Sequence, residues 1–190
     1  MNTVQQIIDW TKKNQWIWLL LGLAILALVI AFVSSKVKVI DKVDSLQKHP
    51  SKTYPTRNLD SVRYIVVHHS ASKTHKAEDF ARWHVEQRNW AGIGYHEVIE
   101  KDGTVCLANR YETRSNHVKN NNTASIGICL SGNFEEEEPT KAQLKSLDSR
   151  IKHIRRQFAQ KLEVKGHRDL QTSTACCGDF LYNYIKNKYS

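Results

Sequence analysis

Two histidines and one cysteine in this 190-residue chain have the residue types of a metal site. His68 ends a run of β-branched residues, His167 follows a second short apolar run, and Cys176 comes nine residues after His167. Two neutral imidazoles and one thiolate form a catalytic zinc set that leaves a fourth position for water. A buried histidine at a strand end more often has a structural role, and a long stretch of chain separates His68 from the other two. Residue types and spacing alone therefore leave both interpretations open.

The elements that would position these side chains alternate irregularly between strands and helices. In chain order, the sequence predicts a buried strand over residues 61–69, a helix over 76–88, a hairpin of strands 95–100 and 105–108, a buried strand over 125–130, a helix after Thr140, a short strand over 162–165 and a helix from Asp179. No regular βαβ units occur. The predicted fold class is mixed α/β, a single central mixed β-sheet flanked by helices and preceded by one N-terminal transmembrane helix.

The transmembrane prediction comes from residues 16–33, which contain no charged side chain. At ~1.5 Å per residue this stretch spans about 27 Å, close to the ~30 Å hydrocarbon core of a bilayer. A cleaved signal peptide would have a shorter apolar run, and a core helix that is apolar all round would need a larger protein around it. We therefore expect a membrane anchor over residues 1–35, a polar tether over 36–60 and a folded domain over 61–190.

Composition narrows the classes of partner. The net charge is +9, charged residues make up 25% and hydrophobic residues 41%, which is typical of a globular protein and excludes bulk disorder. No Lys/Arg run alternates with aromatic residues, so no nucleic-acid partner is expected. The four cysteines, two of them adjacent, do not form a disulfide framework.

Short sequence motifs around the candidate ligands carry a family resemblance. They are Val67-His68-His69-Ser70, Trp83-His84, Gly94-Tyr95-His96, Ser125-Ile126-Gly127-Ile128, Gly166-His167-Arg168-Asp169 and Cys176-Cys177-Gly178-Asp179. In this order, the motifs closely resemble the zinc N-acetylmuramoyl-L-alanine amidases, which include bacteriophage amidase-type lysozymes and peptidoglycan recognition proteins. The resemblance covers residues 61 to about 185 and identifies this domain as an amidase domain.

The resemblance implies an activity and a site. The family hydrolyses the amide bond between N-acetylmuramic acid and L-alanine in peptidoglycan, with Zn²⁺ held here by His68, His167 and Cys176. Tyr95 and Thr174 match catalytic positions near the metal, and His117 resembles a histidine of the substrate groove. Zinc lowers the pKa of a bound water to about 7, and the Tyr95 hydroxyl can donate to the oxyanion.

Departures from the family pattern keep alternatives open. Cys177 stands where the family usually has proline, so two adjacent thiols compete for the metal, and the spacing from His167 to Cys176 is one residue longer than is common. The main alternative is a non-catalytic peptidoglycan-recognition module on a membrane anchor. Recognition-only members lack the metal cysteine, which favours catalysis. A protein-binding regulator built on the same fold is a third, weaker alternative.

The expected partners are peptidoglycan or a muropeptide, and a membrane through residues 16–33. Two lysines precede the apolar stretch and more lysines follow it, which by the positive-inside rule favours a cytoplasmic domain. Peptidoglycan lies outside the cytoplasmic membrane, however. We expect a single-pass membrane protein with its catalytic domain on the cell-wall side.

Overall fold

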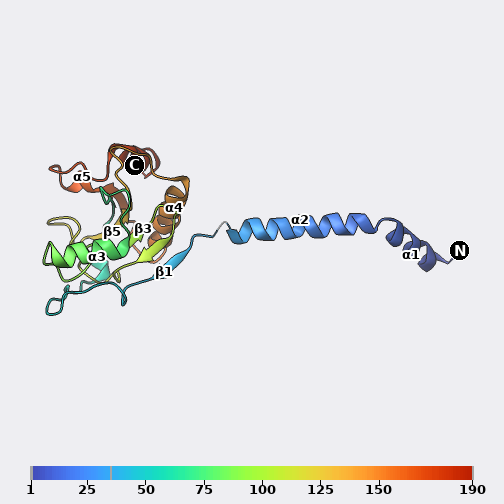
Figure 1. Ribbon diagram of the computed structural model, residues 1–190, viewed down its shortest axis with the longest axis horizontal. Coiled ribbons are helices and arrows are strands. Elements are labelled where there is room, and N and C mark those ends of the chain that lie inside the picture. Colours follow the sequence, from blue (N-terminus) through green and yellow to red (C-terminus); the bar gives the residue numbers. More distant parts are fainter. Residues whose placement is uncertain (1, 35, 190) are drawn as a thin grey trace. The chain divides into compact units, whose positions relative to one another are not determined.

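The computed structural model describes residues 2–34 and 36–189, with the side chains of residues 2–27 and 36–189. Two compact units divide the chain, Met1–Lys36 and Val37–Ser190. The first unit consists of α1 (Thr3–Lys13) and α2 (Gln15–Ser34), drawn in blue in Figure 1.

The expected membrane span over residues 16–33 is not supported. Within the described residues, no helix is both long enough and apolar enough to cross a bilayer. The side chains of residues 28–33 lie outside the described ones.

The second unit contains a six-stranded sheet with the order β1-β4-β3-β5-β2-β6. Its strands are β1 (Val39–Asp41), β2 (Tyr64–His69), β3 (Glu97–Ile99), β4 (Val105–Leu107), β5 (Ser125–Leu130) and β6 (Glu163–Gly166). β3 and β4 form the predicted antiparallel hairpin, and the other neighbouring strands are parallel. The prediction of one mixed sheet is confirmed.

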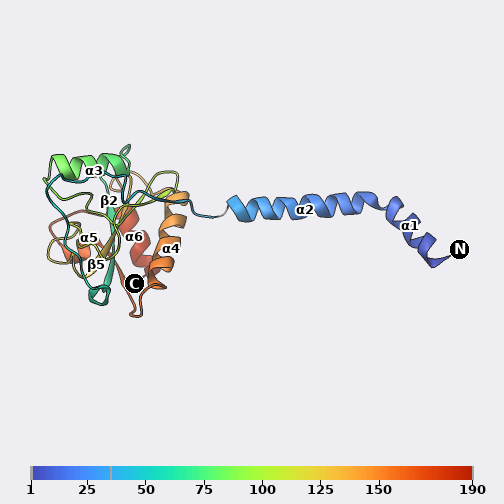
Figure 2. The same cartoon turned by 90° about the horizontal axis from the view of Figure 1, so that it is seen from below.

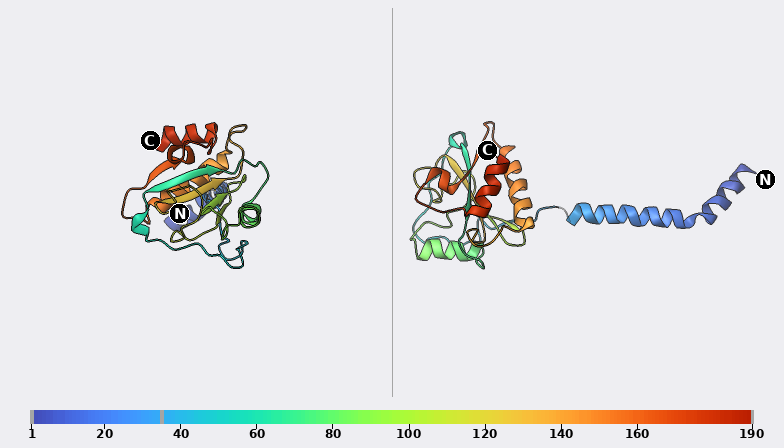
Figure 3. Two further views of the ribbon diagram at one scale, coloured as in Figure 1. Left: turned by 90° about the vertical axis from the view of Figure 1, so that its left-hand side faces the viewer. Right: turned by 90° about the horizontal axis from the view of Figure 1, so that it is seen from above.

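Helices cover both faces of this sheet. They are α3 (Ala77–Glu86), α4 (Lys141–Arg155), the short α5 (His167–Leu170) and α6 (Asp179–Tyr189). Figures 2 and 3 show α4 and α6 side by side on one face and α3 on the other. Leu147 of α4 and Leu181 of α6 belong to the larger core with Ile65 and Val67 of β2, whereas Phe80 of α3 belongs to a smaller core. Because side chains alternate along a strand, His68 lies on the face opposite Val67.

The predicted capping box at the start of α4 is confirmed. Thr140 Oγ1 accepts a hydrogen bond from the backbone N–H of Gln143 at 3.0 Å, and Gln143 Oε1 accepts one from the backbone N–H of Thr140 at 3.1 Å. Two of the otherwise unpaired N–H groups near the helix start are thereby satisfied.

The segment expected to be a tether is part of the folded unit. β1 pairs with β4 in parallel, with Ile40 opposite Cys106. Leu46 is 5% exposed and belongs to the core beneath α3, and Leu59–Ser61 form a 3-10 helix. The sequence pattern did not indicate this packing. β1 is only three residues long, too short for a periodic signal, and the residues after it are mostly polar or proline.

Candidate metal centre

Strand register brings the two predicted histidine ligands to the same edge of the sheet. β2 and β6 are parallel, and Val67 is paired with Gly166. The next residue in each segment is His68, the fifth residue of β2, and His167, the first residue of α5. Their ring centroids are 4.6 Å apart. The long separation in sequence is therefore closed by the pairing of two parallel strands.

Cys176 reaches the same point from the loop between α5 and α6. Its carbonyl accepts a hydrogen bond from the backbone N–H of Arg168 at 2.9 Å, which fastens the loop to α5. Its Sγ lies 3.7 Å from His68 Nδ1 and 3.4 Å from the backbone nitrogen of His69, which donates to it. The ligand atoms of His68, His167 and Cys176 all lie within 4.8 Å of one another. The structure thus brings the three predicted ligands together.

The protonation states of the three donors suit a cation. Burial, followed by the nearby His117 and His167, lowers the pKa of His68 well below its usual value, and burial also lowers the pKa of His167. Both imidazoles are therefore neutral near pH 7, which is the form that binds metals. Burial raises the pKa of the Cys176 thiol to about 12. A bound dication would displace the thiol proton, so this donor set fits zinc.

Tyr95 lies beside the candidate ligands. Its ring centroid is 5.3 Å from that of His68, and burial raises the pKa of its hydroxyl well above 10. The loop is held by Asn109, whose Nδ2 donates to the carbonyls of Ile93 and Tyr95 at 2.8 and 2.7 Å. A protonated, fixed phenol at this place can act as a hydrogen-bond donor to substrate.

Thr174 also lies at the site, at the wall of the same cavity. Its Oγ1 accepts a hydrogen bond from the backbone N–H of Cys176 at 3.2 Å. The hydroxyl therefore shapes the loop that carries the thiol, and its own hydrogen is left for another acceptor.

His117 is placed differently from the prediction of a groove histidine. The side chain borders the cavity but is only 8% exposed. Both ring nitrogens already have partners within the protein, Nδ1 with His68 Nε2 at 3.1 Å and Nε2 with the Ser125 carbonyl at 3.3 Å. Contact of His117 with substrate stays a prediction, and both of its ring nitrogens are already engaged with His68 and Ser125.

A cavity of about 290 Å³ opens above these residues. Sequence reasoning missed Arg88 as one of its lining residues. The Arg88 guanidinium lies 4.6 Å from the centroid of the Trp83 ring, and no carboxylate lines the cavity within the described part of the chain. Arg88 belongs to no motif, so no signal in the sequence marked it.

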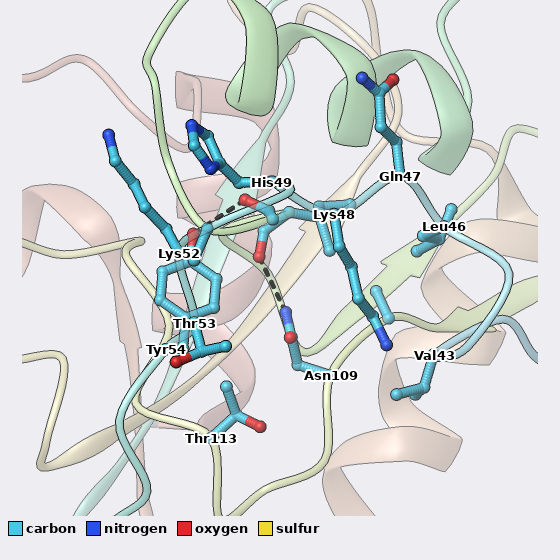
Figure 4. A pocket seen from close by; sticks show the side chains of 14 residues that line it. Val43, Leu46, Gln47, Lys48, His49, Lys52, Thr53, Tyr54, Asn109 and Thr113 are labelled. Atoms are coloured by element: carbon cyan, nitrogen blue, oxygen red, sulfur yellow. Dashed lines mark hydrogen bonds between the residues drawn. The ribbon is translucent and has the colours of Figure 1, made fainter.

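A second cavity, of about 270 Å³, lies between residues 43–54 and the loops that carry Ile93 and Asn109. Figure 4 shows Lys48, His49 and Lys52 among its lining side chains. The Asn109 amide donates a hydrogen bond to the Ile93 carbonyl. The described lysines there already have partners, Asp44 for Lys48 and the Asn89 carbonyl for Lys52. We therefore assign no chemistry to this cavity.

Comparisons with known proteins agree with this geometry. The N-acetylmuramoyl-L-alanine amidase family matches residues 58–179. The chain is 30% identical over 144 residues to an endolysin of Enterobacteria phage K11, covering 72% of this chain and 93% of that one. It is 32% identical over 136 residues to peptidoglycan recognition protein 1 of Bos indicus, covering 66% and 71%.

A solved structure extends the likeness to the fold. The N-acetylmuramoyl-L-alanine amidase LysC from Clostridium intestinale URNW superposes with a TM-score of 0.64 at 28% identity, over 80% of this chain and 97% of that one. Since the family match spans well over half of the sequence, the chain belongs to the N-acetylmuramoyl-L-alanine amidase family.

Proposed function

We propose that this chain is a zinc-dependent amidase that hydrolyses the amide bond between N-acetylmuramic acid and L-alanine in peptidoglycan. One observation carries the proposal. His68, His167 and Cys176 converge within 4.8 Å at a cavity large enough to admit a peptide bond and its neighbours. Two imidazoles and one thiolate would hold a zinc ion with three protein donors, the number found in catalytic rather than structural sites.

The residues around the triad have distinct roles in this proposal. When bound, zinc supplies an activated water near neutral pH and polarises the scissile carbonyl. The buried Tyr95 hydroxyl donates a hydrogen bond to the oxygen on which negative charge develops. The leaving amine takes its proton from Tyr95 or from water. Thr174 keeps the Cys176 loop in shape and offers its hydroxyl hydrogen to the substrate.

Arg88 makes the cavity favour substrates that carry a negative charge. Its guanidinium rests on the Trp83 ring, and no described carboxylate lines the cavity to neutralise it. A substrate that carries a free carboxylate near the scissile amide is favoured there.

Recognition without catalysis is the competing function, because the relatives include both endolysins and recognition proteins. The complete set of three donors favours hydrolysis, since a pure recognition module has no need of a thiol beside two neutral histidines.

The test is zinc content together with digestion of purified peptidoglycan. The purified full chain should hold about one equivalent of zinc, and it should release peptide stems with new alanine amino termini. Both should be abolished by a chelator and restored by zinc. Binding to peptidoglycan without new amino termini, by a zinc-loaded protein, would establish the recognition module instead.

We further propose that the Val37–Ser190 unit acts on the cell-wall side of the cytoplasmic membrane, because its proposed substrate lies there. Protease added to intact spheroplasts should then degrade this unit. Full protection from protease would reverse the assignment and favour action on cytoplasmic muropeptides.

A further inference from the structure

His117 lies between β5 and the first candidate ligand, and its contacts define where the hydrogens are. Its Nε2 is 3.3 Å from the Ser125 carbonyl oxygen, which can only accept. The Ser125 hydroxyl, 3.4 Å away, donates its own hydrogen to the Asn121 carbonyl and so also accepts from Nε2. The ring hydrogen of a neutral His117 is therefore on Nε2, and its Nδ1 is an acceptor.

This assignment fixes the tautomer of His68. His117 Nδ1 lies 3.1 Å from His68 Nε2, so the hydrogen between them is carried by His68 Nε2. His68 Nδ1 then has a free lone pair, and it is this atom that faces Cys176 Sγ at 3.7 Å. We propose that His117 is a positioning residue that holds His68 in the orientation and tautomer in which Nδ1 binds zinc. The inference rests on the zinc site of the proposed function.

The position of His117 is set by the protein, not by a ligand. The backbone N–H groups of His117 and Val118 donate to Asn122 Oδ1 at 2.9 and 2.8 Å. The Arg57 guanidinium donates to the carbonyls of Asn122 and Ser125 and thereby closes the loop that carries His117. A buried imidazole with this many fixed neighbours is suited to orienting another side chain.

Gly127 of β5 supplies the space for the His117 ring. A Cβ atom at this position would lie 2.7 Å from both Cγ and Nδ1 of His117, which is closer than such contacts allow. The glycine of the Ser-Ile-Gly-Ile motif thus has a physical reason, because any larger residue would push the ring away from His68. Gly127→Ala should displace the His117 ring although it removes no hydrogen-bonding side chain from the site.

The second histidine shows the same pattern in a looser form. His167 Nε2 lies 3.3 Å from Gln171 Oε1, which can accept its hydrogen and leave Nδ1 for metal. Gln171 is partly exposed, whereas His117 is buried. Outer-shell partners of metal-binding histidines commonly fix tautomer and ring orientation, and their loss costs about 10–100-fold in metal affinity. The buried His117 should therefore contribute more to zinc affinity than the partly exposed Gln171.

A matched pair of variants tests the proposal in the full-length chain. Asparagine and leucine have nearly the same shape, and asparagine Oδ1 takes the place of histidine Nδ1. His117→Leu should lower zinc affinity about 10–100-fold, measured by competition with a chromophoric chelator, and should change the visible absorption of the Co²⁺-loaded protein. His117→Asn should keep both within a few-fold of the parent chain. Gly127→Ala should resemble His117→Leu.

Controls separate positioning from folding and from the zinc site itself. His84→Phe removes a buried histidine that lines the same cavity without contacting a ligand, and it should leave zinc affinity unchanged. Equal affinities and spectra for His117→Leu, His117→Asn and the parent would overturn the inference. If His117→Leu does not fold, the spectrum of Gly127→Ala against that of the parent decides the question. A parent chain that binds no zinc would instead overturn the proposed function.

Discussion

His68 Nδ1 lies 3.7 Å from Cys176 Sγ, although 108 positions separate the two residues in sequence. The neighbouring thiol of Cys177 is fully buried and belongs to the core beneath α4 and α6. Cys176 lines the cavity, whereas Cys177 does not border it. Of the two adjacent thiols between which the sequence left the choice open, burial thus favours Cys176 as the ligand.

This relationship predicts opposite outcomes for the two cysteines. Cys176→Ala removes a thiolate ligand, so zinc affinity and nearly all hydrolysis should be lost. Cys177→Ala should keep zinc and activity within a few-fold, and it should lower stability by about 1–2 kcal/mol through the small cavity it leaves in the core. Metal content and thermal unfolding of both variants provide the measurement. Zinc retained by Cys176→Ala but lost by Cys177→Ala would mean that the loop is assigned one residue out of place.

Much of the fold could be predicted because long periodic segments carry strong signals. The strand that contains His68 and the amphipathic helix after Thr140 both lie within a few residues of their predicted bounds. The convergence of His68, His167 and Cys176 could not be derived from spacing, because it depends on the pairing of Val67 with Gly166. Only the family resemblance carried that information.

Tyr95→Phe should separate metal binding from turnover. His68, His167 and Cys176 provide the three donors of the candidate site without the phenol, so zinc affinity should stay unchanged. Loss of a main oxyanion donor should lower kcat by ~10²–10³. Tyr64 begins β2, at the end of the strand away from His68. Tyr64→Phe is therefore the matched control and should leave kcat unaltered. Unchanged turnover in Tyr95→Phe would remove the phenol from the mechanism.

The boundary of the folded unit gives a prediction that departs from the sequence analysis. A fragment of residues 37–190 should unfold like the full-length chain, because it keeps β1 paired with β4. A fragment of residues 51–190 loses β1 and Leu46, which uncovers the edge of β4, where Val105 and Cys106 are fully buried. It should be less stable by several kcal/mol and more prone to aggregate. Equal denaturation midpoints for the two fragments would return residues 37–50 to the role of a tether.

Other parts of the site carried no local signal at all. Arg88 is an ordinary charge near the end of a helix in sequence, and only the fold places it and the neighbouring Trp83 at the cavity wall. The resemblance put His117 in the substrate groove, and the structure places it at the border of the cavity with its side chain buried. Its contacts with His68 and Ser125 depend on the loop that Asn122 holds, which no periodicity describes.

Acidification should destabilise the metal-free unit, because several buried histidines stay neutral in the folded state. Burial, followed by Arg88, lowers the pKa of His84 to about 4, and burial, followed by Arg168, lowers that of His69 to about 4. The unfolded chain takes up these protons near pH 6.5 whereas the folded chain does not, so stability is fully present above pH 6.5 and falls as the pH drops towards 4. Each such histidine contributes a slope of up to ~1.4 kcal/mol per pH unit to the free energy of unfolding.

Urea unfolding with chelator at pH 7, 6 and 5 measures the total slope. His84→Gln should make this slope shallower by up to the contribution of one histidine. A slope equally steep in His84→Gln would show that His84 takes up its proton in the folded state.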